Sequence, residues 1–288
     1  MSNSREKTRK ILFLTGFELK KIFRQKHAAV GLAVLLLLVG LCSIGTWIRL
    51  NHHGENKFEG RIMSELVNGI SFSETALLPG IYILLPMMIG ILAASVFAGE
   101  FEGGQIRMIS IRPVSRTSIL MAKFMAVSIY AYICLFFLMV ISYAAGAALF
   151  GFSGDIVVFG PAFLGGNAPI YILNSSEAWT RLFLSYYLAG YSLISIAGLF
   201  IMFSVVIRKL TIAIIIPLGI YFTSYILDVM PFMDSLHKFL PTRYIMIWKY
   251  VMAPQIRWDS VAHDGIFLAL FTICYMAIAI FCFKAKDI

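Results

Sequence analysis

The sequence predicts an all-α integral membrane protein, a single transmembrane domain over residues 1–288 with six transmembrane helices. Of its 288 residues, 60% are hydrophobic and 14% are charged, whereas soluble domains carry about 25% charged residues. The chain also contains six uncharged stretches close to the roughly 20 apolar residues that a helix needs to cross a bilayer. We expect helices to cross, because lipid satisfies no backbone hydrogen bonds and no alternating strand pattern is visible.

The predicted spans are 28–47, 77–98, 124–150, 182–207, 210–227 and 265–283. No charged residue lies in the middle of any of them, and Asp228 only follows the fifth. Ion-coupled carriers place ionisable groups there, so a self-sufficient ion-coupled transporter is disfavoured. The first span has full length and no small-residue cleavage site follows it, so we expect it to remain as an anchor rather than to be removed as a signal peptide.

A basic segment, 8–26, precedes the first span. Five apolar residues of this segment share one face at helical spacing: Ile11, Leu12, Leu19, Ile22 and Phe23. Most of its Lys and Arg residues lie away from that face. This pattern predicts an amphipathic helix in the inner membrane interface. A basic flank without fixed structure is the alternative.

The distribution of basic residues predicts the orientation. The N-terminus, the 99–123 stretch, the turn at 208–209 and the C-terminal tail together hold 16 of the 24 Lys and Arg residues and five acids. Cytoplasmic segments carry this excess in membrane proteins. We therefore expect both termini in the cytoplasm of a bacterial cell, with the chain in its plasma membrane. The asymmetry accounts for the net charge of +9 without a nucleic-acid partner.

Three connections then face outward. Residues 48–76 are polar and are expected to form an outer loop. Residues 156–176 are uncharged, but their prolines and paired glycines predict an outer loop or a shallow re-entrant segment rather than a seventh span. Residues 230–263 are rich in aromatic side chains and divided by prolines, which predicts short outer helices before the sixth span.

No catalytic or metal site is predicted. Gly151 to Gly154 matches the G-x-S-G of intramembrane serine proteases, and Ser153 would need His237 or His263 as its base. A helix-ending turn is the favoured interpretation, because neither histidine lies inside a span. His52 and His53 with Glu55 could hold a metal, but a solvated loop is favoured because adjacent residues chelate poorly as a pair. The four cysteines are expected to be small buried side chains, since none forms a CxxC pair: Cys42, Cys134, Cys274 and Cys282.

The stretch 99–123 is a charged, glycine-containing connector between two apolar spans. Glu100, Phe101, Gly104 and Arg107 can share one short helix along the membrane plane, which Pro113 would end. Ser115 is then suited to cap the following helix. Physics alone leaves two interpretations open, a helix that couples a partner to the bundle and a solvated basic loop.

The sequence of this connector resembles that of bacterial ABC-2 type permeases, the membrane subunits of one class of ATP-binding-cassette exporters. The resemblance lies in Phe97-Ala-Gly-Glu100-Phe-x-x-Gly104-x-x-Arg107, in Ile109-Ser-x-x-Pro113-Val-Ser-Arg116 and in Ala122-Lys123. It implies a coupling helix in a groove of a separate ATPase, with contacts from Glu100, Phe101, Gly104 and Arg107, and a return shaped by Pro113, Ser115 and Arg116. Gln105 and Ile111-Arg112 depart from the common wording.

The resemblance also implies a function. The chain would be a permease subunit and not itself an ATPase, since no G-x-x-x-x-G-K-[ST] phosphate loop occurs in it. ATP and magnesium would bind to the partner ATPase, and a second permease chain, identical or related, would complete the pathway. A membrane scaffold or sensor partner of a cytoplasmic protein is the alternative, and an intramembrane hydrolase built on Ser153 is the third.

Two sets of residues are candidates for the pathway and for the dimer. Apolar and aromatic residues of the second and third spans would suit a hydrophobic or amphipathic cargo such as an antimicrobial peptide, a drug or a lipid: Met87, Met88, Tyr130, Tyr132, Phe136 and Phe137. Small residues of the fourth span would allow close packing against a second chain: Ala189, Gly190, Ser192, Ser195, Ala197 and Gly198.

Overall fold

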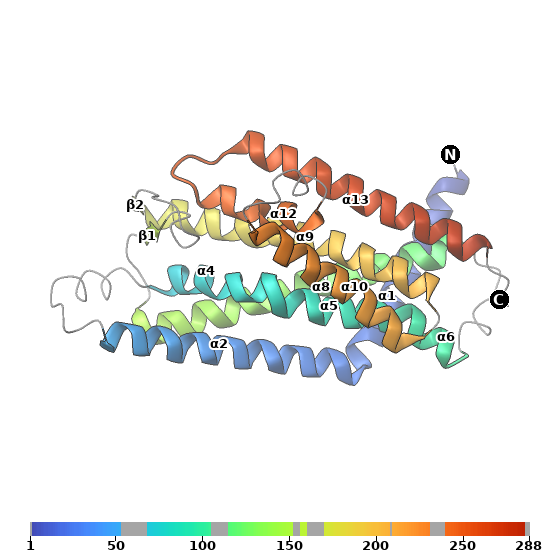
Figure 1. Cartoon of the computed structure of the whole chain (residues 1–288), viewed down its shortest axis with the longest axis horizontal. Helices are drawn as coiled ribbons and strands as arrows, with labels where there is room; N and C mark the ends of the chain where they lie inside the picture. Colours follow the sequence, from blue (N-terminus) through green and yellow to red (C-terminus); the bar gives the residue numbers. More distant parts are fainter. Residues whose placement is uncertain are drawn as a thin grey trace.

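The computed structural model describes residues 2–52, 68–104, 115–151, 156–159, 170–207, 209–230 and 240–285. The long helices run side by side along the longest axis of the molecule (Figure 1). Six helices in the described residues are long and apolar enough to cross a membrane. The chain therefore has the architecture of a multi-pass, predominantly helical membrane protein.

The six predicted stretches fall on these six helices. They are α2 (Lys26–His52), a composite helix from Gly69 to Glu102, α8 (Arg116–Phe150), α9 (Ser175–Val206), α10 (Leu210–Val229) and α13 (Trp258–Ala285). Most of the helices extend beyond the predicted limits, because hydropathy detects the apolar part of a helix, whereas its hydrogen bonds continue into the polar flanks.

The second helix shows this difference most clearly. Its first part, α4 (Gly69–Pro79), begins inside the predicted outer loop 48–76. Asn68 is the cap, since its Oδ1 accepts from the backbone N–H groups of Ile70 and Ser71 at 3.1 Å each. The Ser71 hydroxyl accepts from the N–H of Asn68 at 3.0 Å. This reciprocal cap explains why the helix begins here.

Two π-helical segments interrupt the second helix. The order after α4 is η2 (Gly80–Leu84), α5 (Leu85–Ala94), η3 (Ser95–Gly99) and α6 (Glu100–Glu102). Pro86 has no N–H and cannot donate to the carbonyl of Tyr82. The hydroxyl of Tyr221 on α10 donates to that carbonyl instead, at 2.9 Å. A side chain from another span thus satisfies the interrupted backbone.

The N-terminal helix, α1 (Ser2–Arg24), ends at Gln25 and packs on α8. It lies at the end of the bundle that also holds α6 and both termini (Figure 1). Thr15, Glu18 and Ile22 are buried, at helical spacing on one face. The apolar face expected from the sequence is split, since Ile22 is buried whereas Leu12 and Phe23 are 59% and 45% exposed. The face of α1 that packs against α8 therefore contains the carboxylate of Glu18.

Within residues 156–176, where an outer loop or a shallow re-entrant segment was expected, the described residues include two short strands, and residues 160–169 lie outside the described part. Strands β1 (Ile156–Phe159) and β2 (Ile170–Leu173) pair antiparallel, with Ile156 opposite Leu173 and Phe159 opposite Ile170. Both strands are rich in β-branched residues, which favour extended backbone. This hairpin is the exception to the all-α prediction within the described residues.

The described part of the connection from α10 to α13 contains two short helices. They are α12 (Pro241–Tyr244) and the 3-10 helix η5 (Ile245–Met252). Ile247, Trp248 and Val251 of η5 are buried, mostly against α9. Short helices are thus present where the prolines and aromatic residues predicted them.

The centre of the bundle is α9. In its most apolar window 72% of the residues are buried, against 22% in α2, α10 and α13. Ser73 of α4, Ser142 of α8 and Tyr186 of α9 join hydroxyls inside it, at 2.8 Å between the serines and 3.1 Å from Ser73 to Tyr186. α9, the second helix and α8 therefore form the interior, and α2, α10 and α13 lie around it.

Candidate functional site

The 99–123 connector begins as a direct continuation of the second helix. Glu100 to Glu102 add a last turn, and the chain then turns at Gly103 and Gly104. Gly104 has φ +70°, which favours glycine. Of the residues expected in the coupling helix, Glu100, Phe101 and Gly104 are described, whereas Arg107 and Pro113 lie outside the described residues. The described part of the connector extends the span rather than lying across it.

The far end of the connector is the start of α8. Ser115 caps that helix as predicted, since its hydroxyl accepts from the N–H of Ser118 at 3.3 Å. Arg116 donates to the backbone carbonyls of Phe283 and Lys284 at 3.4 and 3.5 Å. It therefore ties the start of α8 to the last turn of α13, where orphan carbonyls need donors.

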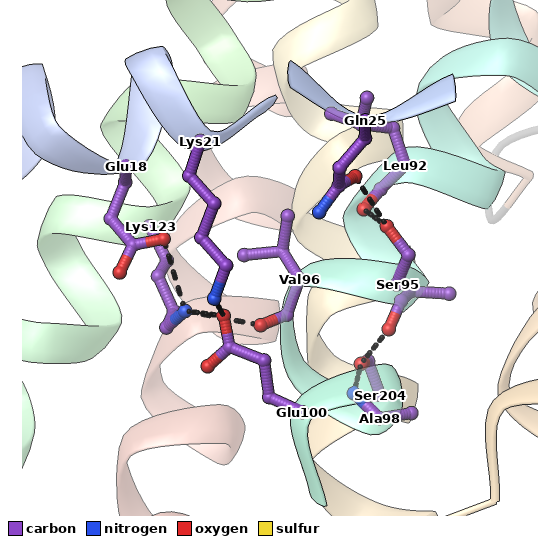
Figure 2. Close-up of polar contacts among 11 residues, drawn as sticks. Glu18, Lys21, Gln25, Leu92, Ser95, Val96, Ala98, Glu100, Lys123 and Ser204 are labelled. Atoms are coloured by element: carbon purple, nitrogen blue, oxygen red, sulfur yellow. Dashed lines mark hydrogen bonds and ion pairs between the residues drawn. The ribbon is translucent and has the colours of Figure 1, made fainter. Parts of the chain in front are cut away.

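Lys123 is the centre of a buried ion cluster, one that also contains Glu18, Lys21 and Glu100 (Figure 2). The side chain of Lys123 is 1% exposed. Its Nζ donates to Glu100 Oε1 at 2.7 Å, to the carbonyl of Val96 at 3.1 Å and to Glu18 Oε2 at 3.2 Å. These three acceptors match the three protons of an ammonium group. The cation also lies 5.4 Å from the centre of the Phe97 ring.

Glu100 connects this lysine to the N-terminal helix. Its Oε1 also accepts from Lys21 Nζ at 2.5 Å. The side chain of Glu100 is 5% exposed, and its Oε2 has no hydrogen-bond partner among the described residues. The carboxylate that the resemblance places in a partner's groove thus points into the bundle and binds two lysines.

α1 presents Glu18 and Lys21 to this cluster from adjacent turns (Figure 2). The same end of α1 makes a further contact to the second helix, since the Ser95 hydroxyl lies 3.4 Å from Gln25 Oε1 and donates to the carbonyl of Leu92 at 2.8 Å. Gln25 is the break between α1 and α2. The cluster therefore joins α1, the second helix and α8 at one point.

The electrostatics of the cluster are balanced, with two cations and two carboxylates. Burying a charge costs several kcal/mol unless it is paired, and breaking a buried pair costs about 3–5 kcal/mol because it leaves an uncompensated charge. Lys123, Glu100 and Glu18 are thus strongly dependent on one another, whereas solvent screens the pair that Lys21, with its side chain 33% exposed, makes with Glu100. A displacement of the connector at either end must either carry its partners along or break an ion pair.

The other predicted coupling residues take different places. Phe101 lies edge-on to Phe283, with ring centres 6.4 Å apart, and Phe97 contacts the same ring at 5.8 Å. Glu102 accepts from the backbone N–H of Leu210 at 3.2 Å. The connector therefore touches the last turn of α13 and the first turn of α10. Described parts of the connector thus lie beside the ends of α10 and α13 that adjoin two other segments predicted on the basic side.

The six candidate pathway residues do not line one surface. Tyr130 is buried and donates to the carbonyl of Ala28 at 3.2 Å. On the opposite side of α8, Tyr132 stacks on Tyr187 and Phe136 is 63% exposed. Phe137, Met87 and Met88 are partly buried, and a Cβ on Gly31 would lie 2.3 Å from the end of Met88. Tyr130 lies at the contact of α8 with α2, Met88 at that of α5 with α2, and Tyr132 at that of α8 with α9.

The six small residues of α9, candidates for a dimer face, are buried within this chain: Ala189, Gly190, Ser192, Ser195, Ala197 and Gly198. A Cβ on Gly190 would lie 2.2 Å from the Tyr132 ring. Their small size permits close packing inside the bundle, because α9 is its central helix.

A second set of polar contacts holds the opposite end. Arg181 of α9 is 4% exposed and donates to the carbonyls of Val251, Ala253 and Pro254 at 3.2, 2.5 and 3.2 Å, and to Glu177. Lys249 of η5 donates to the Tyr82 hydroxyl at 2.5 Å. Burial lowers the pKa of Lys249 to about 8. Both side chains anchor the segment before α13.

The candidates for other chemistry gain no support from geometry. Ser153, His53, Glu55 and His237 lie outside the described residues. His263 contacts Asp264 at 3.0 Å, and its ring is tilted by 48° to that of Phe267. Within the described part of the chain, no group of three His, Cys, Asp or Glu residues could hold a metal ion. All four cysteines are free. Cys134 is buried as expected, whereas Cys42 and Cys282 are half-buried and Cys274 is exposed.

The sequence did not predict the contacts of Glu18 and Lys21 in the ion cluster, or those of Ser204 with the backbone of Ala94 and Ala98. Glu18 was the detectable one, because it is the only acid between Lys7 and Gln25 and shares a helical face with Thr15 and Ile22. No sequence signal distinguishes Lys21 from its neighbour Lys20, or Ser204 from the other serines of α9. Their partners lie 79 and more than 100 residues away.

Comparisons with known proteins give a family but no activity. The family model described as "Protein of unknown function (DUF2705)" matches residues 36–288. The chain is also similar to a Bacillus subtilis (strain 168) protein named "Uncharacterized protein YhcI", with 25% identity over 215 residues. That alignment covers 69% of this chain and 63% of the relative, so the chain spans less than two thirds of that protein.

Proposed function

Since the chain belongs to the DUF2705 family, which names no activity, we propose from its own residues that it is the permease subunit of an ATP-binding-cassette exporter. The sequence resemblance of its connector to ABC-2 type permeases motivates the proposal. The sequence holds no phosphate loop, so the proposal assigns ATP and magnesium to a separate cytoplasmic ATPase.

One observation carries the proposal: the two ends of the 99–123 connector are joined by a buried ion pair. Glu100 stands at its start and Lys123 at its end, 2.7 Å apart, and Lys21 and Glu18 bind the pair to α1. A solvated loop between two spans needs no such link. A link of this kind would transmit a push on the connector into α1, the second helix and α8 at once.

The proposed assembly has two permease chains and two ATPase subunits. The basic end of the bundle, with α1, α6 and the end of α13, would face the cytoplasm of a bacterial cell. There α1 would lie at the membrane interface, because Phe13 and Phe17 are 79% and 65% exposed beside the exposed Arg9 and Lys20. The short helices α12 and η5 would then lie on the outer side.

A hydrophobic or amphipathic cargo, such as an antimicrobial peptide, a drug or a lipid, remains the proposed class. The exposed apolar side chains of the described spans, such as those of Phe136 and Phe183, support it. Because Tyr130 and Tyr132 lie on opposite sides of α8, the proposal assigns no single cargo site to the six candidate pathway residues. A pathway between two copies of the chain would use surfaces that one chain exposes.

Co-purification tests the proposal. The full-length tagged chain, isolated from its native host, should bring down an ATP-binding-cassette ATPase. ATP hydrolysis by the complex should fall about tenfold in Glu100→Gln, equivalent to about 1.4 kcal/mol in the barrier. Glu102→Gln is the matched control, since this exposed carboxylate lies on the same turn and glutamine can still accept from Leu210.

Two results would overturn the proposal. Equal hydrolysis in Glu100→Gln and in the control would remove the connector from the coupling. Capture of a cytoplasmic protein without ATPase activity would instead favour the scaffold or sensor function. Labelling by a serine-hydrolase probe that is lost in Ser153→Ala would favour the third alternative.

A further inference from the structure

Ser204 of α9 inserts its hydroxyl into the backbone of the second helix (Figure 2). The N–H of Ala98 donates to Ser204 Oγ at 2.8 Å, and Ser204 Oγ donates to the carbonyl of Ala94 at 2.9 Å. Residues 98 and 94 are the pair that an α-helix joins directly, since its N–H groups donate four residues back. The serine hydroxyl therefore stands where one α-helical hydrogen bond would be.

This insertion coincides with the π-helical segment η3 (Ser95–Gly99). A π turn closes its hydrogen bonds five residues apart rather than four, and therefore holds about one residue more per turn. Were η3 to close into an α-helix, every residue after it would turn by on the order of 100°, the rotation of one residue. Ser204, Ala94 and Ala98 are all 0% exposed, so these hydrogen bonds lie inside the bundle.

The residues after η3 are those of the ion cluster. Glu100 is the first residue beyond it and reaches Lys21 and Lys123 only in the observed rotation. Lys123 also donates to the carbonyl of Val96, within η3 itself. The π segment is thus bound from α9 by Ser204 and from α8 by Lys123, and a turn of 100° would move the Glu100 carboxylate away from both lysines.

We propose that Ser204 is a positioning residue that holds the second helix in the π register and thereby orients Glu100 and the connector. Closing η3 into an α-helix requires the hydroxyl to leave the Ala98–Ala94 pair and turns α6 relative to α5. The register and the ion cluster are thus two parts of one conformational device. That this turn moves a coupled ATPase rests on the proposed function, whereas the register itself does not.

Cross-linking at the start of the connector measures the register without any ATPase. Glu102 contacts the backbone of Leu210 through the end of its side chain, so Glu102→Cys with Leu210→Cys, in a chain with its four native cysteines replaced by alanine, should be joined in membranes by a short bismaleimide cross-linker. Adding Ser204→Ala should lower the rate about tenfold, because two hydrogen bonds that hold the π register are lost. Ser204→Thr keeps the hydroxyl and should restore the rate.

Ser192→Ala is the matched control. This buried serine of the same helix donates to the carbonyl of Ala189 in α9 itself, so its loss should leave the rate unchanged. If Ser204→Ala fails to accumulate, the cross-linking rates of Ser204→Thr and Ser204→Val are compared instead, because these two side chains have equal shape and differ in the hydroxyl. Equal cross-linking with and without the hydroxyl overturns the proposal. A hydroxyl-dependent rate in a chain that binds no ATPase supports the register and overturns only the proposed function.

Discussion

Lys123 and Glu100 form a buried ion pair at 2.7 Å that closes the 99–123 connector upon itself. The pair brings the start of α8 against the end of the second helix, and Lys21 and Glu18 add α1 to the same contact. The connector is therefore anchored at both ends in the interior of the bundle. A displacement of either end of the connector would therefore disturb the ion pairs of this cluster.

The first prediction concerns this pair. Glu100→Gln should lower the free energy of unfolding by about 3 kcal/mol, because it leaves Lys21 and Lys123 with one carboxylate between them. The double variant Glu100→Leu with Lys123→Met should be closer to the native chain than either single change, since it removes one charge of each sign and leaves the cluster neutral. Denaturation midpoints of the purified full chain measure both. Additive single effects would show that the two residues act independently.

Close helix packing gives the second prediction. A Cβ on Gly90 would lie 2.4 Å from the ring of Phe200, which is 0% exposed. Gly90→Ala should therefore destabilise the chain by about 1–3 kcal/mol, the cost of overpacking. At Gly40 of α2 a Cβ meets nothing within 4 Å, so Gly40→Ala should be neutral or slightly stabilising through helix propensity. Thermal unfolding in detergent would compare them, and equal midpoints would contradict the described contact of α5 with α9.

The third prediction concerns Arg181. Its guanidinium binds three backbone carbonyls between Val251 and Pro254, and lysine lacks the planar fork to do so. Arg181→Lys should speed hydrogen exchange in the segment from η5 to the start of α13, because the free energy of local opening there should fall by on the order of 1–3 kcal/mol. Arg243→Lys, at an exposed position of α12, is the control. Unaltered exchange in Arg181→Lys would mean that the segment is held by its apolar contacts.

A pH dependence follows from Lys249. Burial lowers its pKa in the folded chain from 10.5 to about 8. Between these values the unfolded chain holds a proton that the folded chain has released, so the contribution of this group to stability rises with pH. From pH 8 to pH 10 the native midpoint should therefore rise relative to that of Lys249→Met. Lys20→Met, at an exposed position of α1, should follow the native chain, and parallel curves for all three would refute the prediction.

Much of the fold was predictable because hydropathy is a property of local composition. Each apolar run found its helix, and the Ser115 cap was predicted from one residue. The strands at 156–159 and 170–173 were not, since uncharged residues with prolines fit several structures until a register of pairing is known. The small residues of α9 predicted close packing against a second chain, and in the single chain they are buried against its own helices.

The sequence by itself determined that this is a six-helix membrane chain with a basic end and a distinctive connector, because charge and apolar length are carried by each segment alone. Only the tertiary structure decided what the connector residues do. Glu100 reaches Lys21 and Lys123 across 79 and 23 residues, and Ser204 meets Ala98 across 106. Contacts at such separations depend on how helices pack and rotate, and a change of one residue in the register of the second helix would reassign them all.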